Sequence, residues 1–140
     1  MSRNYVSIDV FDTCLVRRCG MPEKIWDLMC ERLFEKNDFR GKLSFVNSRE
    51  NAEKLASIEY RYPNINEIYD FFDVSQWGFE KEQVANLEME IEETELFPNP
   101  YMLERISKLR EKGCKIFFVS DMYLPSFFIK RILIKYGFCL

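Results

Sequence analysis

Two short runs of β-branched and aromatic residues, one near each end of the chain, most constrain the fold that this sequence can adopt. Residues 5–10 read YVSIDV and residues 115–119 read KIFFV, and both have the length and composition of a buried strand. Most of the sequence between them carries apolar residues at helical spacing. A strand, a helix and a second strand in this order predict a βαβ unit, whose sheet is parallel.

The helical pattern breaks into separate segments at prolines, glycines and capping residues. The second predicted helix should turn Ala52, Leu55, Ala56 and Ile58 towards the core. The predicted helices cover residues 22–36, 47–60, 64–72, 80–95, 100–112 and 125–136. The order is therefore a strand, a long helical insert, a helix, a strand and a final helix.

Three signals mark where individual helices begin and end. Asn64 followed by Glu67 is typical of a capping box, and Asn99 before Pro100 is typical of an N-cap with proline in the first turn. Gly113 is placed to close that helix in the C′ position. The charges in residues 80–95 predict a largely solvated helix. Its apolar residues Val84, Leu87 and Ile91, at helical spacing, are expected to face inward.

The sequence contains no histidine, and this absence excludes several classes of active site. Catalysis by Ser-His-Asp or Cys-His groups and histidine-based zinc sites are ruled out. Acid–base chemistry would fall to carboxylates, Lys, Tyr or Cys. A net charge of −3 gives no basic field for nucleic acid, so no nucleic-acid partner is expected.

The cysteines and the hydropathy pattern predict a cytoplasmic protein. The five cysteines are odd in number and none has CxxC spacing, which favours free thiols in a reducing compartment. The first ten residues lack a long apolar stretch and contain Asp9, so no signal peptide is expected. No segment approaches the roughly 18 apolar residues that a membrane span needs.

Polar residues follow both predicted strands. Asp9, Asp12 and Thr13 lie at the end of the first strand, and Ser120 and Asp121 lie at the end of the second. Ligands of open parallel sheets bind beyond the carboxyl ends of the strands, so these two clusters should converge on one pocket. Taken alone, an Asp after a strand is more often a turn former or a helix cap, and the pairing of the clusters is what favours a site.

These residues also carry a family resemblance. The segments IDVFDTCL (residues 8–15) and KIFFVSDMYL (residues 115–124) resemble the first two motifs of haloacid dehalogenase-type hydrolases. More narrowly, DVFDT, SRENAE, INEIYDFF, LFPNPYML and VSDMYLP resemble the members associated with bacterial glycosyltransferases and surface-polysaccharide loci. The resemblance implies an incomplete Rossmann-like parallel-sheet core (residues 1–16 and 96–140) and a helical cap inserted after the first strand (residues 17–95).

The resemblance implies a Mg²⁺-dependent phosphohydrolase acting on a small phosphorylated metabolite or sugar. In that function Asp9 is the nucleophile and a metal ligand, and the backbone carbonyl of Phe11 is a second metal ligand. Thr13 matches the threonine of the first motif and is counted with Asp9 among the expected catalytic residues. Ser120 matches the phosphate-binding hydroxyl. Asp12 and Asp121 are expected to bind the substrate together with Ser120.

Two departures from the family pattern leave alternatives open. Phe11 stands where phosphatases carry an acidic proton donor, and a phenyl ring cannot transfer a proton. The chain also reaches Leu140 before the lysine and acids of the later motifs, so we expect this C-terminally truncated chain to be catalytically poor. The alternatives are a non-catalytic ligand- or partner-binding module in polysaccharide biosynthesis and a 2-haloacid dehalogenase-like hydrolase. An exposed edge of so small a sheet could also support self-association.

Overall fold

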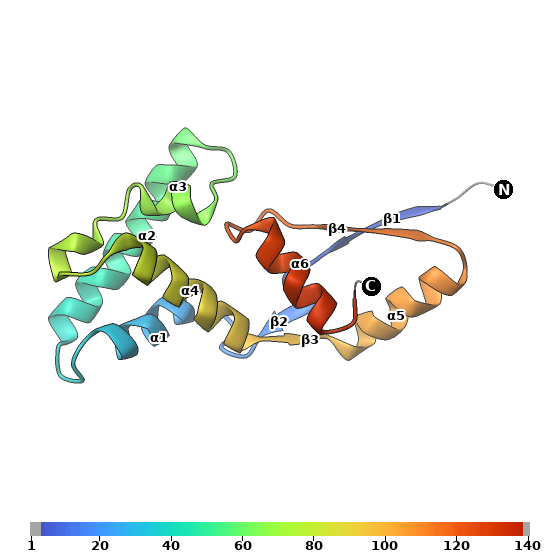
Figure 1. Cartoon of the computed structure of the whole chain (residues 1–140), viewed down its shortest axis with the longest axis horizontal. Coiled ribbons are helices and arrows are strands. Elements are labelled where there is room, and N and C mark those ends of the chain that lie inside the picture. Colours follow the sequence, from blue (N-terminus) through green and yellow to red (C-terminus); the bar gives the residue numbers. More distant parts are fainter. Residues whose placement is uncertain (1–3, 139–140) are drawn as a thin grey trace.

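The computed structural model describes residues 4–138 and is a mixed α/β structure with a small parallel sheet (Figure 1). The strands are β1 (Tyr5–Asp9), β2 (Leu15–Arg17), β3 (Leu96–Pro98) and β4 (Lys115–Val119). The helices are α1 (Glu23–Leu33), α2 (Phe39–Glu59), α3 (Ile65–Tyr69), the 3-10 helix η1 (Val74–Trp77), α4 (Lys81–Glu95), α5 (Pro100–Glu111) and α6 (Ser126–Lys135).

The parallel sheet consists of the two strands predicted from the sequence. β1 pairs with β4 in parallel, with Ile8 opposite Phe118 and Asp9 opposite Val119. Side chains alternate between the two faces of a strand, so Ile8 is buried while Asp9 and Val119 face outwards. On the outward face the rings of Tyr5 and Phe117 stack at 5.7 Å. The predicted parallel pairing is confirmed.

Helix α5 leads into β4 and has the boundaries that its capping residues predict. The Asn99 side chain accepts a hydrogen bond from the backbone N–H of Tyr101, and Pro100 occupies the first turn. Gly113 follows the last turn with φ +81°, a left-handed conformation that glycine adopts without strain. The predicted helix start and C′ glycine are both confirmed.

A short antiparallel ribbon, β2 paired with β3, is present although the sequence patterns did not indicate it. Leu15 lies opposite Pro98, and Arg17 lies opposite Leu96. Each strand has three residues, which is too short for a periodic signal. The ribbon joins the point where the chain leaves the sheet region to the point where it returns.

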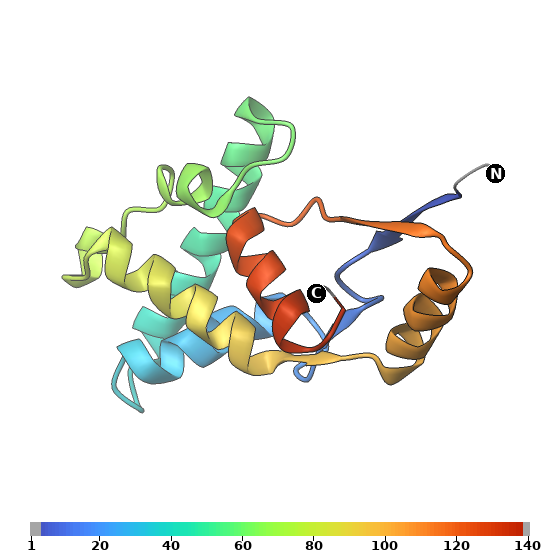
Figure 2. The same cartoon turned by 45° about the vertical axis from the view of Figure 1, so that its right-hand side comes forward.

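The segment from the last residue of β2 to the start of β3, residues 17–95, is called the helical insert below. Its helices gather at one end of the molecule, away from the sheet (Figures 1 and 2). α1 packs against α2 and α4, and α3 packs against the same two helices. Their interior includes edge-to-face contacts of Phe45 with Phe34 and Phe72, at 5.6 and 5.1 Å between ring centroids. The capping box of Asn64 and Glu67 is confirmed at the start of α3.

Helix α2 begins at Phe39, well before the predicted start at residue 47. The Asp38 side chain accepts a hydrogen bond from the backbone N–H of Gly41 at 2.9 Å and so caps the helix. A Cβ on Gly41 would lie within 3 Å of the Asp38 carboxylate, so a larger residue there would require the Asp38 side chain to shift. The apolar pattern in this first part of α2 is weak, and the prediction therefore missed it.

The buried face of α2 also differs from the prediction. Ala52 and Ala56 are buried as expected, but Leu55 is 39% exposed and Ile58 is 83% exposed. The inward stripe continues through Arg49, which is fully buried. A charged residue therefore occupies a core position, and the apolar pattern assigned the face incorrectly.

Helix α4 is less solvated than its charges predict. Val84 and Ile91 are buried and Leu87 is partly buried, as predicted. Glu88 and Glu92, however, are 0% exposed. Burial of a carboxylate requires a charged or hydrogen-bonding partner, and both partners come from distant parts of the chain.

Helix α6 lies between the helical insert and the sheet region (Figure 2). Phe128 and Ile132 are buried on its inner face. Arg131 forms an ion pair with Glu93 at 2.8 Å, and the Tyr136 hydroxyl donates a hydrogen bond to the carbonyl of Leu96 at 3.1 Å. These contacts join α6 to the end of α4 and to β3.

Two further sequence predictions concern thiols and membranes. Cys19, Cys30 and Cys114 are free thiols, as expected, and Cys139 lies outside the described residues. Burial raises the pKa of the Cys30 thiol to about 12, so this cysteine is not a ready nucleophile. Across residues 4–138 no helix has both the length and the apolar character to cross a membrane.

Candidate active site

The parallel pairing brings the two polar clusters to the same edge of the sheet. The backbone N–H of Val10 donates a hydrogen bond to the carbonyl of Val119 at 3.1 Å, which extends the pairing past the end of β1. Because Val10 is 1% exposed, alternation turns Asp9 to the open side, and the chain of β4 continues into Ser120 and Asp121. The predicted convergence of the two strand ends is therefore present.

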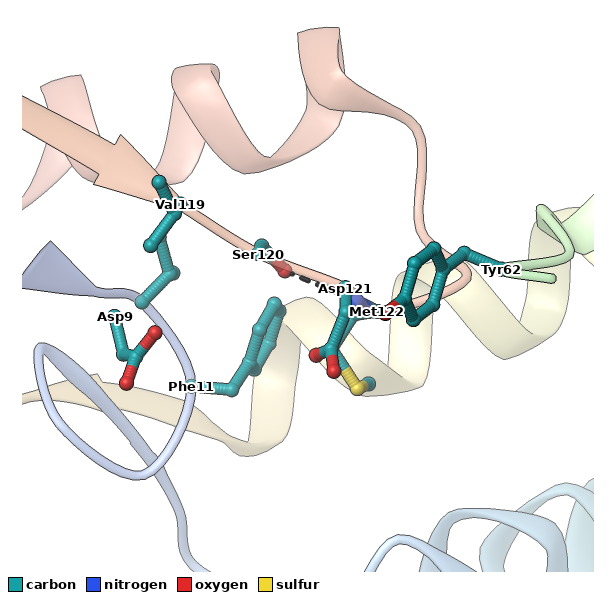
Figure 3. Close-up of a pocket in the computed structure, with 8 residues that line it drawn as sticks. Asp9, Phe11, Tyr62, Val119, Ser120, Asp121 and Met122 are labelled. Carbon is teal, nitrogen blue, oxygen red and sulfur yellow. Dashed lines mark hydrogen bonds between the residues drawn. The ribbon is translucent and has the colours of Figure 1, made fainter. Parts of the chain in front are cut away.

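An open pocket of about 620 Å³ lies at this edge. Figure 3 shows the side chains around it, with the Asp9 carboxylate on one side, Asp121 on the other and the Phe11 ring between them. The pocket is lined by Asp9, Val10, Phe11, Tyr62, Val119, Ser120, Asp121 and Met122. It thus contains three of the predicted polar site residues, and one residue, Tyr62, that the sequence patterns did not indicate.

The Ser120 side chain is oriented by the loop that follows β4. Its Oγ accepts a hydrogen bond from the backbone N–H of Met122 at 3.2 Å (Figure 3). A hydroxyl that accepts one bond still has its own O–H to donate. Ser120 is exposed at the pocket, so it can donate this hydrogen bond to an anionic ligand.

Asp12 and Thr13 do not line the pocket. The chain turns back after Val10, whose carbonyl accepts hydrogen bonds from the N–H groups of Cys14 and Leu15 at 2.9 Å. Asp12 has φ +61° within this turn, and the Thr13 carbonyl accepts a hydrogen bond from the Asn99 side chain at 3.0 Å. In this arrangement both residues shape the turn and anchor it to the start of α5.

The ring of Phe11, which lines the pocket, packs against a buried arginine. The guanidinium carbon of Arg17 lies 5.1 Å from the centre of the Phe11 ring, and its Nη2 lies 3.8 Å from the sulfur of Met122. Arg17 is 4% exposed and forms two hydrogen bonds with Glu92, at 3.0 and 3.2 Å. Burial alone would lower the pKa of Arg17, but the carboxylate of Glu92 outweighs it and raises the pKa. Arg17 therefore stays charged and supports two walls of the pocket.

The same network extends from Glu92 to α2 and α3 of the helical insert. Glu92 accepts a hydrogen bond from the Tyr123 hydroxyl at 2.7 Å, and the Tyr123 ring lies 5.1 Å from the guanidinium of Arg49. Arg49 in turn forms hydrogen bonds of 2.8 and 2.7 Å with Glu88, which also accepts from the Tyr69 hydroxyl at 2.8 Å. Sequence reasoning missed this network, although an arginine in line with buried alanines on α2 was a signal.

This network joins the helical insert to the loop that lines the pocket. Tyr123 follows the pocket residues Ser120–Met122 directly, and its backbone carbonyl accepts a hydrogen bond from the N–H of Ile65 at 2.7 Å. Tyr123 thus contacts α4 through its hydroxyl, α2 through its ring and α3 through its backbone. The position of the pocket loop therefore depends on the packing of the insert.

One basic residue of α6, Lys130, lines a groove next to the pocket. This apolar groove shares Val10, Ser120 and Met122 with the pocket, and Ser126 also lines it. Lys130 is exposed. Within residues 4–138 no group of three or more Cys, Asp or Glu side chains is placed to hold a metal ion by itself.

Comparison with known proteins adds no family assignment to this geometry. No protein-family model matches the chain, and no curated protein has significant sequence similarity to it. The functional assignment therefore depends on the pocket and on the chemistry of the residues that line it.

Proposed function

We propose that the chain has a haloacid dehalogenase-type core with the helical insert as its cap, and that it belongs to a Mg²⁺-dependent phosphohydrolase. Its substrate in this proposal is a small phosphorylated metabolite or sugar. The observation that supports the proposal most directly is the shared pocket of Asp9, Ser120 and Asp121 beyond the carboxyl ends of two paired parallel strands.

In the proposed reaction Asp9 is the nucleophile. A carboxylate oxygen of Asp9 forms a bond to phosphorus while the bond from phosphorus to the leaving oxygen breaks. The Ser120 hydroxyl, oriented by Met122, donates a hydrogen bond to a phosphoryl oxygen. Water then hydrolyses the aspartyl-phosphate, which releases inorganic phosphate and regenerates the Asp9 carboxylate.

The donors at the pocket are compatible with Mg²⁺. This ion prefers oxygen ligands and commonly binds through one or two carboxylates, keeping several water molecules. Asp9 supplies a carboxylate at the pocket, and the backbone carbonyl of Phe11 supplies a second oxygen nearby in the chain. When bound, Mg²⁺ would neutralise charge on the phosphoryl group. Asp9 and the Phe11 carbonyl are the groups proposed to hold it.

Replacing the nucleophile tests the proposal. Phosphate release from a panel of phosphate esters in the presence of Mg²⁺ should fall at least tenfold in Asp9→Asn, because an amide is a far weaker nucleophile. Asp27→Asn makes the same chemical change at an exposed position on α1 and should keep the wild-type rate. Phosphate release that survives Asp9→Asn would show that Asp9 has another role.

Phe11 at the position of the usual proton donor predicts which phosphate esters react fastest. Phe11 cannot protonate a leaving oxygen, and general acid catalysis usually contributes about 10²–10⁴-fold to such steps. Aryl and acyl phosphates, whose leaving groups need no proton, should therefore react at least tenfold faster than alkyl phosphates. Initial rates of phosphate release from p-nitrophenyl phosphate and glycerol 3-phosphate measure this ratio. Equal rates would mean that another side chain donates the proton.

Phe11 also favours a second candidate function, a non-catalytic module that binds a ligand or partner in polysaccharide assembly. An apolar wall between two carboxylates contributes contact area to binding but no proton transfer (Figure 3). Retained ligand binding with no turnover on the whole panel would support this candidate. Halide release from a 2-haloacid without Mg²⁺ would instead favour the dehalogenase-like alternative.

A further inference from the structure

Tyr62 is the residue through which the helical insert reaches the candidate active site. It lies between α2 and α3, yet it lines the same pocket as Asp9 and Ser120. Figure 3 shows its ring beside Asp121 and Met122, on the side of the pocket opposite to Asp9. The side chain is 62% exposed, so a large aromatic surface remains available to a ligand.

The backbone at Tyr62 is positioned by the segment that follows it. Pro63 restricts the backbone, and Asn64 and Glu67 form the reciprocal hydrogen bonds of the capping box at 2.9 and 3.0 Å. Ile65 then donates its N–H to the carbonyl of Tyr123, directly after the pocket loop. These bonds fix the backbone that directly follows Tyr62 next to the pocket loop, so less of the chain needs to be ordered when a ligand binds.

The chemistry around Tyr62 points to a particular class of ligand. Asp121 and Asp9 are carboxylates, which accept hydrogen bonds and therefore favour a ligand rich in hydroxyl groups. The aromatic face of Tyr62 favours a ligand that also presents a flat apolar surface. The guanidinium of Arg61 lies 5.5 Å from the centre of that ring and adds positive charge at the same rim. A sugar ring combines hydroxyl donors at its edge with C–H groups on its face.

We propose that Tyr62 is a specificity-determining residue that stacks against the sugar ring of a hexose phosphate whose phosphate group lies at Ser120. This inference rests on the proposed function for the location of the phosphate. The sugar hydroxyls donate hydrogen bonds to Asp121. Phosphorylated compounds without a ring bind at Ser120 but make no stacking contact with Tyr62, so their affinity does not depend on it.

Binding measurements test this proposal without requiring turnover. Dissociation constants are measured by NMR titration of the whole chain with glucose 6-phosphate, glycerol 3-phosphate and inorganic phosphate. Glucose 6-phosphate should bind about tenfold more tightly than glycerol 3-phosphate, a difference typical of one aromatic contact. Tyr62→Ala should remove this difference and leave the affinity for glycerol 3-phosphate unchanged. Tyr62→Phe keeps the ring and should keep the preference.

A matched control and two contrary outcomes complete the experiment. Tyr101→Ala removes an exposed tyrosine on α5, away from this pocket, and should leave all three affinities unchanged. Equal loss of affinity for all three compounds in Tyr62→Ala would overturn the proposal. In a further titration with adenosine 5′-monophosphate, tighter binding than that of glucose 6-phosphate would also overturn it. If Asp9→Asn leaves phosphate release unchanged while the Tyr62 preference is present, the proposed role of Asp9 as nucleophile fails and the sugar-binding role of Tyr62 stands.

Discussion

Arg49→Met is expected to lower the free energy of unfolding by about 3–5 kcal/mol, the usual cost of removing one partner from a buried ion pair. Arg49 and Glu88 are both 0% exposed and are joined by hydrogen bonds of 2.8 and 2.7 Å. Without the guanidinium, the Glu88 carboxylate would keep only the Tyr69 hydroxyl as a partner, at 2.8 Å. Urea unfolding followed by circular dichroism measures the change.

A control on the same helix separates burial from charge. Lys54 is 71% exposed and forms an ion pair with Glu50 at 3.6 Å, so Lys54→Met should cost less than about 1 kcal/mol. Combining Arg49→Met with Glu88→Leu removes both charges, and the double variant should be more stable than Arg49→Met by at least about 1 kcal/mol. A double variant less stable than Arg49→Met would mean that an isolated buried charge is not the cause.

Much of the fold could be predicted because its signals are local. The bounds of β4 follow directly from the composition of residues 115–119, and the start of α5 follows from Asn99 and Pro100. The capping box at Asn64 likewise depends on residues three positions apart. In each case the residues that determine the structure are close together in the sequence, so a pattern in one short window is sufficient.

The buried charges could not be predicted because their partners are distant in the sequence. Glu88 pairs with a residue 39 positions away, and Glu92 pairs with a residue 75 positions away. Their charge alone led to the prediction that both glutamates are solvated, although Glu88 is four residues after Val84 and three before Ile91. The structure buries them because Arg49 and Arg17 reach the same interior from α2 and β2. Only the tertiary arrangement brings these charges together.

The candidate site was predictable to the same extent as the sheet. Asp9, Ser120 and Asp121 share a pocket because Asp9 ends one strand of the parallel pair and the other two directly follow the second strand. Tyr62 was not indicated, because it enters from a loop of the insert and belongs to no strand end. Asp12 was expected at the site, but it adopts a left-handed conformation in a tight turn and does not line the pocket.

The buried tyrosines of the network should make the protein lose stability at high pH. Burial raises the pKa of both Tyr69 and Tyr123 well above 10, and the neighbouring carboxylates raise it further. In the unfolded chain a tyrosine titrates near pH 10. The folded protein therefore holds these protons more tightly, and their contribution to stability is complete below about pH 10. Above that pH the unfolded chain releases its protons first, and the contribution is lost as the pH rises towards the folded pKa values.

Each such tyrosine lowers the free energy of unfolding by about 1.4 kcal/mol per pH unit above pH 10, so the two together lower it by about 3 kcal/mol per unit. Urea unfolding at pH 9, 10 and 11 gives this slope. The Tyr69→Phe/Tyr123→Phe variant should lose most of it, since phenylalanine has no proton to release. Tyr101→Phe changes a tyrosine that is 65% exposed and should keep the wild-type slope. A double variant with the wild-type slope would show that the alkaline loss arises from other groups, and that the network keeps its hydrogen bonds at high pH.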